Sequence, residues 1–248
     1  MKILNADWEK RNLGVSCTEI TVELTDVAKA VRTAIGQIGD DYVVVKVPVP
    51  RVDVMLALQE AGYAVIEVAI GLHSRLQEAV FPRLYQRYES QLSFRQADAK
   101  DVIRIMSEIQ GGVFATDRIS LDPRFAPAQA ATRYRHWIED ELSRNSKAYV
   151  ATFKSDDIGF SVLRNDGAGR FNGLFGGLYP AKKNTALGFA VGWANIITAK
   201  ELGGTSIATT VSTNNLAALK MNLSIGYEVR DMGYVLVKHA GPASRIAR

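Results

Sequence analysis

The chain has 248 residues, of which 47% are hydrophobic and 23% are charged, and its formal net charge is +4. This balance is typical of a globular protein, and the length suffices for one large or two small domains with a sizeable core. The charge allows an anionic ligand, but no basic stripe with interleaved aromatic residues points to a nucleic-acid partner. The single cysteine, Cys17, excludes an internal disulfide, and the three histidines lack metal-ligand spacing, which argues against a metal enzyme.

The N-terminal segment, MKILNADWEKRNLG, is too polar and too charged for a signal peptide. No apolar run approaches the ~20 residues that a membrane-spanning helix needs. The sequence therefore predicts a cytoplasmic protein without a membrane partner.

The first part of the chain alternates strand-like and helix-like segments. A helix capped by Asp26 and a second helix from about Val52 are predicted between strands at 17–24, 42–49 and 63–72. The strand 42–49 is nearly continuous in apolar residues, which suits a strand covered on both faces. Such alternation is typical of an α/β arrangement. The mixed segment 75–91, which Pro82 interrupts, marks a boundary, so we predict an N-terminal α/β domain over residues 1–90.

A second domain is predicted over residues 91–240. Asp98 is expected to cap a helix, and Pro127 to stand in the first turn of a longer one. Three strands then form a meander, joined by turns rich in Asp, Asn and Gly. Residues 241–248 are predicted to form a flexible tail.

The stretch from Phe175 to Tyr227 carries most of the information on function. It predicts a strand, a turn, a long helix, a strand, an Asn-capped helix and a Gly-Tyr pair before the last strand. This order, with its junction residues, resembles the acetyl-CoA-binding half of the GNAT superfamily of N-acetyltransferases. The resemblance implies an α/β (α+β) protein with the GNAT fold, a mixed central sheet flanked by helices, preceded by a smaller truncated GNAT-like α/β domain.

In GNAT enzymes the fourth strand leads into a turn of pattern Gln/Arg-x-x-Gly-x-Gly/Ala, which binds the pyrophosphate of acetyl-CoA at a helix N-terminus. Here the turn spans 183–188, and Ala186 replaces the first glycine. An ordinary loop before a core helix is the alternative. The resemblance assigns cofactor contacts to this turn and the strand before it: Phe175, Gly177, Leu178, Lys183, Asn184, Thr185, Ala186 and Gly188.

The following helix carries the Asn-x-x-Ala pattern at Asn215 and Ala218, which in GNAT enzymes contacts the pantetheine or phosphate region. Simple helix capping is the alternative for Asn215. Many members have, farther along this helix, a tyrosine that protonates the departing thiolate, and Asn222 occupies that position here. Because an amide cannot give up a proton at useful pH, either Asn222 only positions, another residue is the acid, or the protein is not catalytic.

Within the superfamily the layout is closest to acetyltransferases of nucleotide-linked amino sugars, TDP-fucosamine acetyltransferase among them. The matching patches include Asp117-Arg118-Ile119 and the Tyr134-Arg135-His136-Trp137 run. On this basis Arg118 is assigned to the substrate, since a guanidinium suits a diphosphate or a carboxylate, and a surface salt bridge is the alternative. Glu67 and Asp117 are candidates for the general base only if the fold brings them near.

The sequence thus predicts an N-acyltransferase that moves an acetyl group from acetyl-CoA to the amine of a small acceptor, with Asn222 at the catalytic position. A nucleotide-linked amino sugar is the candidate acceptor, and the resemblance allows a homodimer. The alternative is a GNAT-fold CoA-binding or regulatory module without transferase activity. A third hypothesis, an α/β protein unrelated to GNAT, predicts no CoA binding.

Overall fold

The computed structural model describes residues 1–183 and 185–241. Its strands are β1 (Lys2–Asn5), β2 (Cys17–Thr21), β3 (Tyr42–Pro48), β4 (Ala64–Arg75), β5 (Leu92–Gln96), β6 (Ser146–Phe153), β7 (Asp156–Gly167), β8 (Arg170–Leu178), β9 (Ser206–Ser212) and β10 (Glu228–His239). Its helices are α1 (Trp8–Leu13), α2 (Ala28–Gly36), α3 (Val52–Glu60), α4 (Ala99–Gln110), α5 (Arg118–Leu121), α6 (Pro127–Leu142), α7 (Gly188–Glu201) and α8 (Leu216–Ser224), with short 3-10 segments η1 (Arg83–Gln91) and η2 (Pro180–Lys182).

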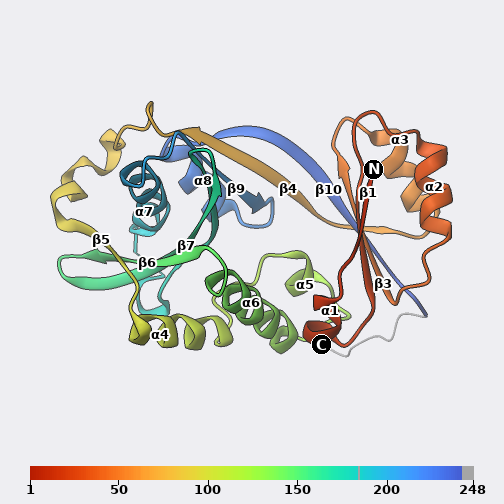
Figure 1. The fold of residues 1–248 in the computed structure, drawn as a ribbon, viewed down its shortest axis with the longest axis horizontal. Helices are drawn as coiled ribbons and strands as arrows, with labels where there is room; N and C mark the ends of the chain where they lie inside the picture. Colours follow the sequence, from red (N-terminus) through yellow and green to blue (C-terminus); the bar gives the residue numbers. More distant parts are fainter. Residues whose placement is uncertain (184, 242–248) are drawn as a thin grey trace.

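The strands form one mixed sheet in the order β1-β2-β3-β10-β4-β9-β8-β7-β6-β5 (Figure 1). β4 comes early in the chain, yet it lies between β10 and β9 and pairs antiparallel with both. Figure 1 shows the long strands β4 and β10 running together between the two ends of the molecule. The sheet is therefore continuous across the boundary predicted near residue 90, and the division into domains 1–90 and 91–240 stays a prediction. Beyond Gly241, the predicted tail lies outside the described residues.

Helices cover both faces of the sheet in its N-terminal part. Val43, Val45 and Val47 of β3 pack with α2 and α3 on one face, while Tyr42 and Val44 pack with α1, α5 and α6 on the other. Because successive strand residues point to opposite faces, a nearly continuous apolar run, broken here only by the exposed Lys46, suits a strand that is buried on both sides. This prediction for β3 is confirmed.

In the C-terminal part, α7 is buried along most of its length. Phe189 and Trp193 belong to a core with the sheet residues Phe171 and Ile207. The connector after β4 also packs against this helix, since the ring of Tyr85 stacks on Phe189 with centroids 3.8 Å apart. On the opposite face of the sheet, α4 and α6 pack against β6 and β7. No helix in the described ranges is both long and apolar enough to cross a bilayer.

Two predicted helix starts are confirmed, and one is wrong. Asp98 caps α4 by accepting hydrogen bonds from backbone N–H groups of the first turn, and Pro127 is the first residue of α6. Asp26 does not cap α2, which begins at Ala28. Its carboxylate instead accepts a hydrogen bond of 2.7 Å from the N-terminal ammonium, because β1 brings the chain start close to it.

Candidate active site

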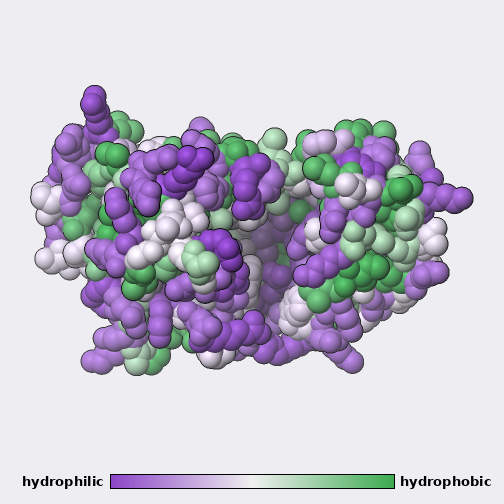
Figure 2. Space-filling model, turned by 45° about the horizontal axis from the view of Figure 1, so that its top comes forward, coloured by the Kyte–Doolittle hydropathy of each residue, from purple (hydrophilic) through white to green (hydrophobic). Residues whose placement is uncertain are grey.

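A cavity of about 810 Å³ lies between the N-terminal and C-terminal parts of the sheet. Its walls are formed by residues of α1, α5, α6, α7 and α8 and of β2, β3, β4, β8, β9 and β10. Figure 2 shows a hollow with hydrophilic residues near the middle of the molecule. The volume falls in the range of about 300–1,000 Å³ that is typical of small-molecule sites.

The strands β8 and β9 diverge at the inner end of this cavity. They pair in parallel only through Arg170–Asn172 and Ser206–Ala208, after which β9 continues to pair with β4. One residue of β8, Leu174, also bulges from the pairing with β7. Thr209 Oγ1 donates a hydrogen bond of 2.7 Å to the Gly173 carbonyl where the strands separate. Beyond this point no described strand pairs with the second edge of β8, so its backbone groups are available to a ligand.

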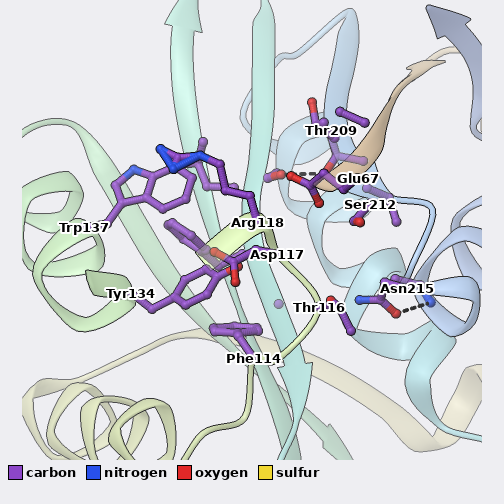
Figure 3. Close-up of a pocket in the computed structure, with 18 of the residues that line it drawn as sticks. Glu67, Phe114, Thr116, Asp117, Arg118, Tyr134, Trp137, Thr209, Ser212 and Asn215 are labelled. Carbon is purple, nitrogen blue, oxygen red and sulfur yellow. Dashed lines mark hydrogen bonds between the residues drawn. The ribbon is translucent and has the colours of Figure 1, made fainter. Parts of the chain in front are cut away.

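Glu67 of β4 lies in the same cavity, beside Ser212 of β9 (Figure 3). Burial raises the pKa of the Glu67 carboxyl; the Asp117 carboxylate adds to this rise, while Ser212 and Arg118 oppose it. A carboxylate with a raised pKa holds a proton more readily than an exposed one. This property suits a general base that takes a proton from a substrate.

An aromatic cluster forms the wall on the other side of the view in Figure 3, where Phe114, Tyr134 and Trp137 lie. The rings of Trp137 and Phe175 meet edge to face with centroids 4.3 Å apart, and those of Phe114 and Tyr134 lie 4.8 Å apart. Burial, with the Asp117 charge, raises the pKa of the Tyr134 phenol, which therefore stays protonated. The cavity thus combines flat aromatic surfaces with carboxylates, which suits a cationic or hydroxyl-bearing ligand.

No protein-family model matches the chain, and no curated protein matches it. Solved structures do match. A GCN5-related N-acetyltransferase (GNAT) from Sphaerobacter thermophilus matches with a TM-score of 0.64 and 12% identity over 99% of this chain and 78% of that one. Another from Kribbella flavida matches with a TM-score of 0.55 and 13% identity over 92% and 82%. A tandem GNAT protein from the clavulanic acid biosynthesis pathway has a TM-score of 0.52 and 14% identity over 88% and 69%.

The chain has the GNAT fold. In this fold the predicted cofactor turn lies between β8 and α7, where Lys183, Thr185 and Ala186 are exposed. The helix begins at Gly188, two residues after Ala186, where the sequence pattern predicts its start. Asn184 lies outside the described residues. An exposed turn before a helix N-terminus is open to an anionic ligand, and the assignment of these residues to the cofactor stays a prediction.

The other residues predicted on β8 occupy its diverging end. Phe175 lines the cavity. Gly177 faces the side chain of Phe114, since a Cβ built on it would lie 3.7 Å from that ring. Leu178 is the nearest neighbour to a Cβ built on Gly188, at 4.0 Å, so the space beside the start of α7 is open.

Asn215, Ala218 and Asn222 line the cavity along α8. Asn215 Oδ1 accepts a hydrogen bond of 3.0 Å from the Ala218 backbone, which confirms that Asn215 caps the helix. The cap uses only the oxygen, and Figure 3 shows the amide nitrogen pointing into the cavity. Asn222 is buried, and its Nδ2 donates a hydrogen bond of 2.9 Å to the Ala218 carbonyl. The Asn222 amide is therefore held by its own helix.

Arg118 lies at the start of α5, within a buried ion network. Its Nη2 donates to carboxylate oxygens of Glu9 and Glu19, and Arg133 and Lys46 bind the same two carboxylates. Burial alone would raise the pKa of Glu19, but Arg118 and Lys46 hold it at about 2. The surface salt bridge considered for Arg118 is thus a buried one. Its Nη1 has no hydrogen-bond partner among the described residues, and the contact of Arg118 with a substrate stays a prediction.

Three polar residues of the cavity, Asn195, Thr209 and Ser212, were not predicted. Asn195 interrupts the apolar run of α7, and a buried polar residue in such a run is a signal that could have identified it. Thr209 and Ser212 are ordinary strand residues that gave no signal. Glu67 and Asp117, named as candidate bases, do line one cavity.

Proposed function

We propose that the protein is an acyl-CoA-dependent N-acyltransferase that transfers an acetyl group from acetyl-CoA to the amine of a small acceptor. The observation that carries this proposal is the single cavity that joins the diverging ends of β8 and β9 to the carboxylate of Glu67. A thioester bound along the strands and an amine bound beside the carboxylate would meet in it.

The residues around β8, α7 and α8 fit the chemistry of the cofactor. The pantetheine arm carries amide groups, which match the unpaired backbone edge of β8 and the amide nitrogen of Asn215. The pyrophosphate is anionic, and it matches the exposed turn with Lys183 at the start of α7, where backbone N–H groups and the helix dipole favour negative charge. Acetyl-CoA supplies the acetyl group as a reactive thioester.

Glu67 acts as the general base. It takes a proton from the acceptor ammonium, which frees the nitrogen lone pair. The nitrogen then forms a bond to the acetyl carbonyl carbon while the bond from that carbon to sulfur breaks. The nitrogen then loses its remaining excess proton. This proton neutralises the departing thiolate, so the products are the amide and the free thiol of CoA. Asn222 has a positioning role: its amide donates a hydrogen bond to the Ala218 carbonyl of α8, and it does not supply this proton.

The acceptor that we propose first is a nucleotide-linked amino sugar. Trp8 and Trp137 line the cavity and are 39% and 38% exposed. Exposed aromatic rings bind the flat faces of sugars and bases. Arg144 lines the same cavity and brings positive charge toward a diphosphate, whereas Arg11 and Arg133 of the lining are paired with Asp140 and Glu9.

A CoA-binding or regulatory module without transferase activity is the second candidate. Asn222 favours it, because the amide at the position of the usual acid is bonded within its own helix. Both candidates require CoA binding. They differ in whether an added amine releases the free thiol of CoA from acetyl-CoA.

Calorimetric binding of acetyl-CoA tests the proposal first. We expect micromolar affinity that Gly188→Trp abolishes, because the indole would fill the start of α7. Gly188→Ala is the matched control and should bind normally, since its Cβ would lie 4.0 Å from the nearest side-chain atom. Thiol release is then measured with a panel of amines that includes nucleotide-linked amino sugars. Absence of binding by the native chain would overturn the proposal, and binding without thiol release would favour the module.

A further inference from the structure

Asn195 is a buried polar residue on a largely apolar helix. It lies between Ala194 and Ile196 in α7, and 8% of its surface is exposed. Its Oδ1 has no hydrogen-bond partner among the residues that the structure describes, although the side chain lines the cavity. A buried acceptor without a donor destabilises the folded state, so a partner from outside the chain is expected.

The position of Asn195 is set by the strand that it faces. Gly173 is the first residue of β8 beyond the segment paired with β9, and a Cβ built there would lie 2.9 Å from Asn195 Nδ2. The absence of a side chain at Gly173 therefore lets the amide approach the backbone of β8. The Gly173 carbonyl already accepts the hydrogen bond from Thr209. The amide of Asn195 is thus held at the point where the strands diverge.

We propose that Asn195 binds the pantetheine arm of the cofactor, with Oδ1 accepting a hydrogen bond from the amide N–H nearest the sulfur. The inference rests on the proposed function. At the reactive end of acetyl-CoA this N–H is the only donor, because the acetyl group and the thioester sulfur carry none. Asn195 follows Gly188 by seven residues, which places it about 10 Å along the helix from the phosphate turn. An extended arm bound at the turn is long enough to reach Asn195.

The test compares Asn195→Leu with Thr198→Val, which changes a buried polar residue of the same helix outside the cavity lining. Calorimetry measures the binding of acetyl-CoA and of adenosine 3′,5′-bisphosphate, which lacks the pantetheine arm, and thermal unfolding is measured without ligand. We expect Asn195→Leu to weaken acetyl-CoA binding about tenfold, to leave the bisphosphate unaffected, and to keep or raise Tm. Thr198→Val should leave acetyl-CoA binding unchanged.

A lower Tm of Asn195→Leu with unchanged affinity for acetyl-CoA would make Asn195 a structural residue and overturn this inference alone. Equal weakening of both ligands would also overturn it. If the native chain binds neither ligand, the proposed function falls and this inference falls with it. Asn195→Ala is the second variant, for use if the leucine is not accommodated, and it should show the same selective loss.

Discussion

Arg118 Nη2 lies 2.9 Å from Glu9 Oε1, although the two residues are 109 positions apart in the chain. Glu9 of α1 has no exposed surface, and Arg118 of α5 is 6% exposed. The pair therefore joins the N-terminal segment to the segment that carries Asp117 and forms a wall of the cavity. Because a buried charge without its partner is strongly unfavourable, each of the two residues depends on the other.

Arg118→Met should lower the free energy of unfolding by about 3–5 kcal/mol, because it leaves Glu9 buried with one cation fewer. Urea denaturation at neutral pH measures the loss. Arg118→Lys keeps the charge and should lose less. If Arg118→Met keeps full stability and loses only acceptor affinity, the contact with the substrate is its main role instead.

Glu19 should make stability depend on acid pH. Its folded-state pKa of about 2 lies below its ordinary value of 4.5, because Arg118 and Lys46 outweigh burial. Its contribution is therefore present above about pH 4.5 and is lost as the pH falls toward 2. At pH 7, Glu19→Gln should be less stable by about 3 kcal/mol, from the size of the shift. Urea denaturation at several pH values should show this difference shrinking in the acid window. A difference that stays constant to pH 2 would contradict the assignment.

Glu67→Gln should lower kcat by about 10²–10⁴-fold, the range for loss of a general base. The acid limb of the native pH profile of kcat/KM reports the raised pKa of Glu67, so it should be missing in the variant. Affinity for acetyl-CoA, measured by calorimetry, should not change. An unchanged kcat would place the base elsewhere.

Glu67 also gives a prediction for the pH dependence of stability, and its sign is opposite to that for Glu19. Because the folded-state pKa of Glu67 is raised, its contribution is present at low pH and is lost as the pH rises through that pKa. Glu67→Gln carries no charge at any pH, so its stability relative to the native chain should increase over this rise. Thermal unfolding of both proteins, measured as the pH is raised from below the ordinary Glu pKa of 4.5, checks the sign.

Asn222→Tyr should raise thiol release about tenfold or more, because it places a phenol where many GNAT enzymes carry their general acid. Asn222→Phe is the matched control. Both variants lose the hydrogen bond to the Ala218 carbonyl, so only the hydroxyl distinguishes them. Equal rates for the two variants would show that the acid lies elsewhere in the cavity or that none is used.

Features with local causes were predictable from the sequence. Asp98 caps α4 through its own first turn, and Asn215 caps α8 in the same way. The nearly continuous apolar run of β3 predicted a strand buried on both faces. The order from β8 to β10 likewise followed from junction residues, since turns and helix ends are set by a few neighbours.

Features that depend on distant partners were not predictable. The pattern of β4 identifies a strand but does not say that Ala69–Arg75 pairs with Ser206–Ser212. The position of Glu67 in the cavity follows from that pairing, so its role stayed open. The partners of Arg118 were equally hidden, because Glu9 and Glu19 lie in segments that only the folded chain brings together.

The place of β4 in the sheet also bears on how the chain is made. β4 is synthesised well before its neighbours β9 and β10, which begin at Ser206 and Glu228. During translation both of its edges are open, and open strand edges are where nascent chains associate with one another. Pairing of strands that are so far apart in the sequence is slow. The sheet can therefore be completed between β3 and β4 only after β10 has left the ribosome. A premature stop before Glu228 would remove the strand between β3 and β4 and leave two separate sheets in place of one.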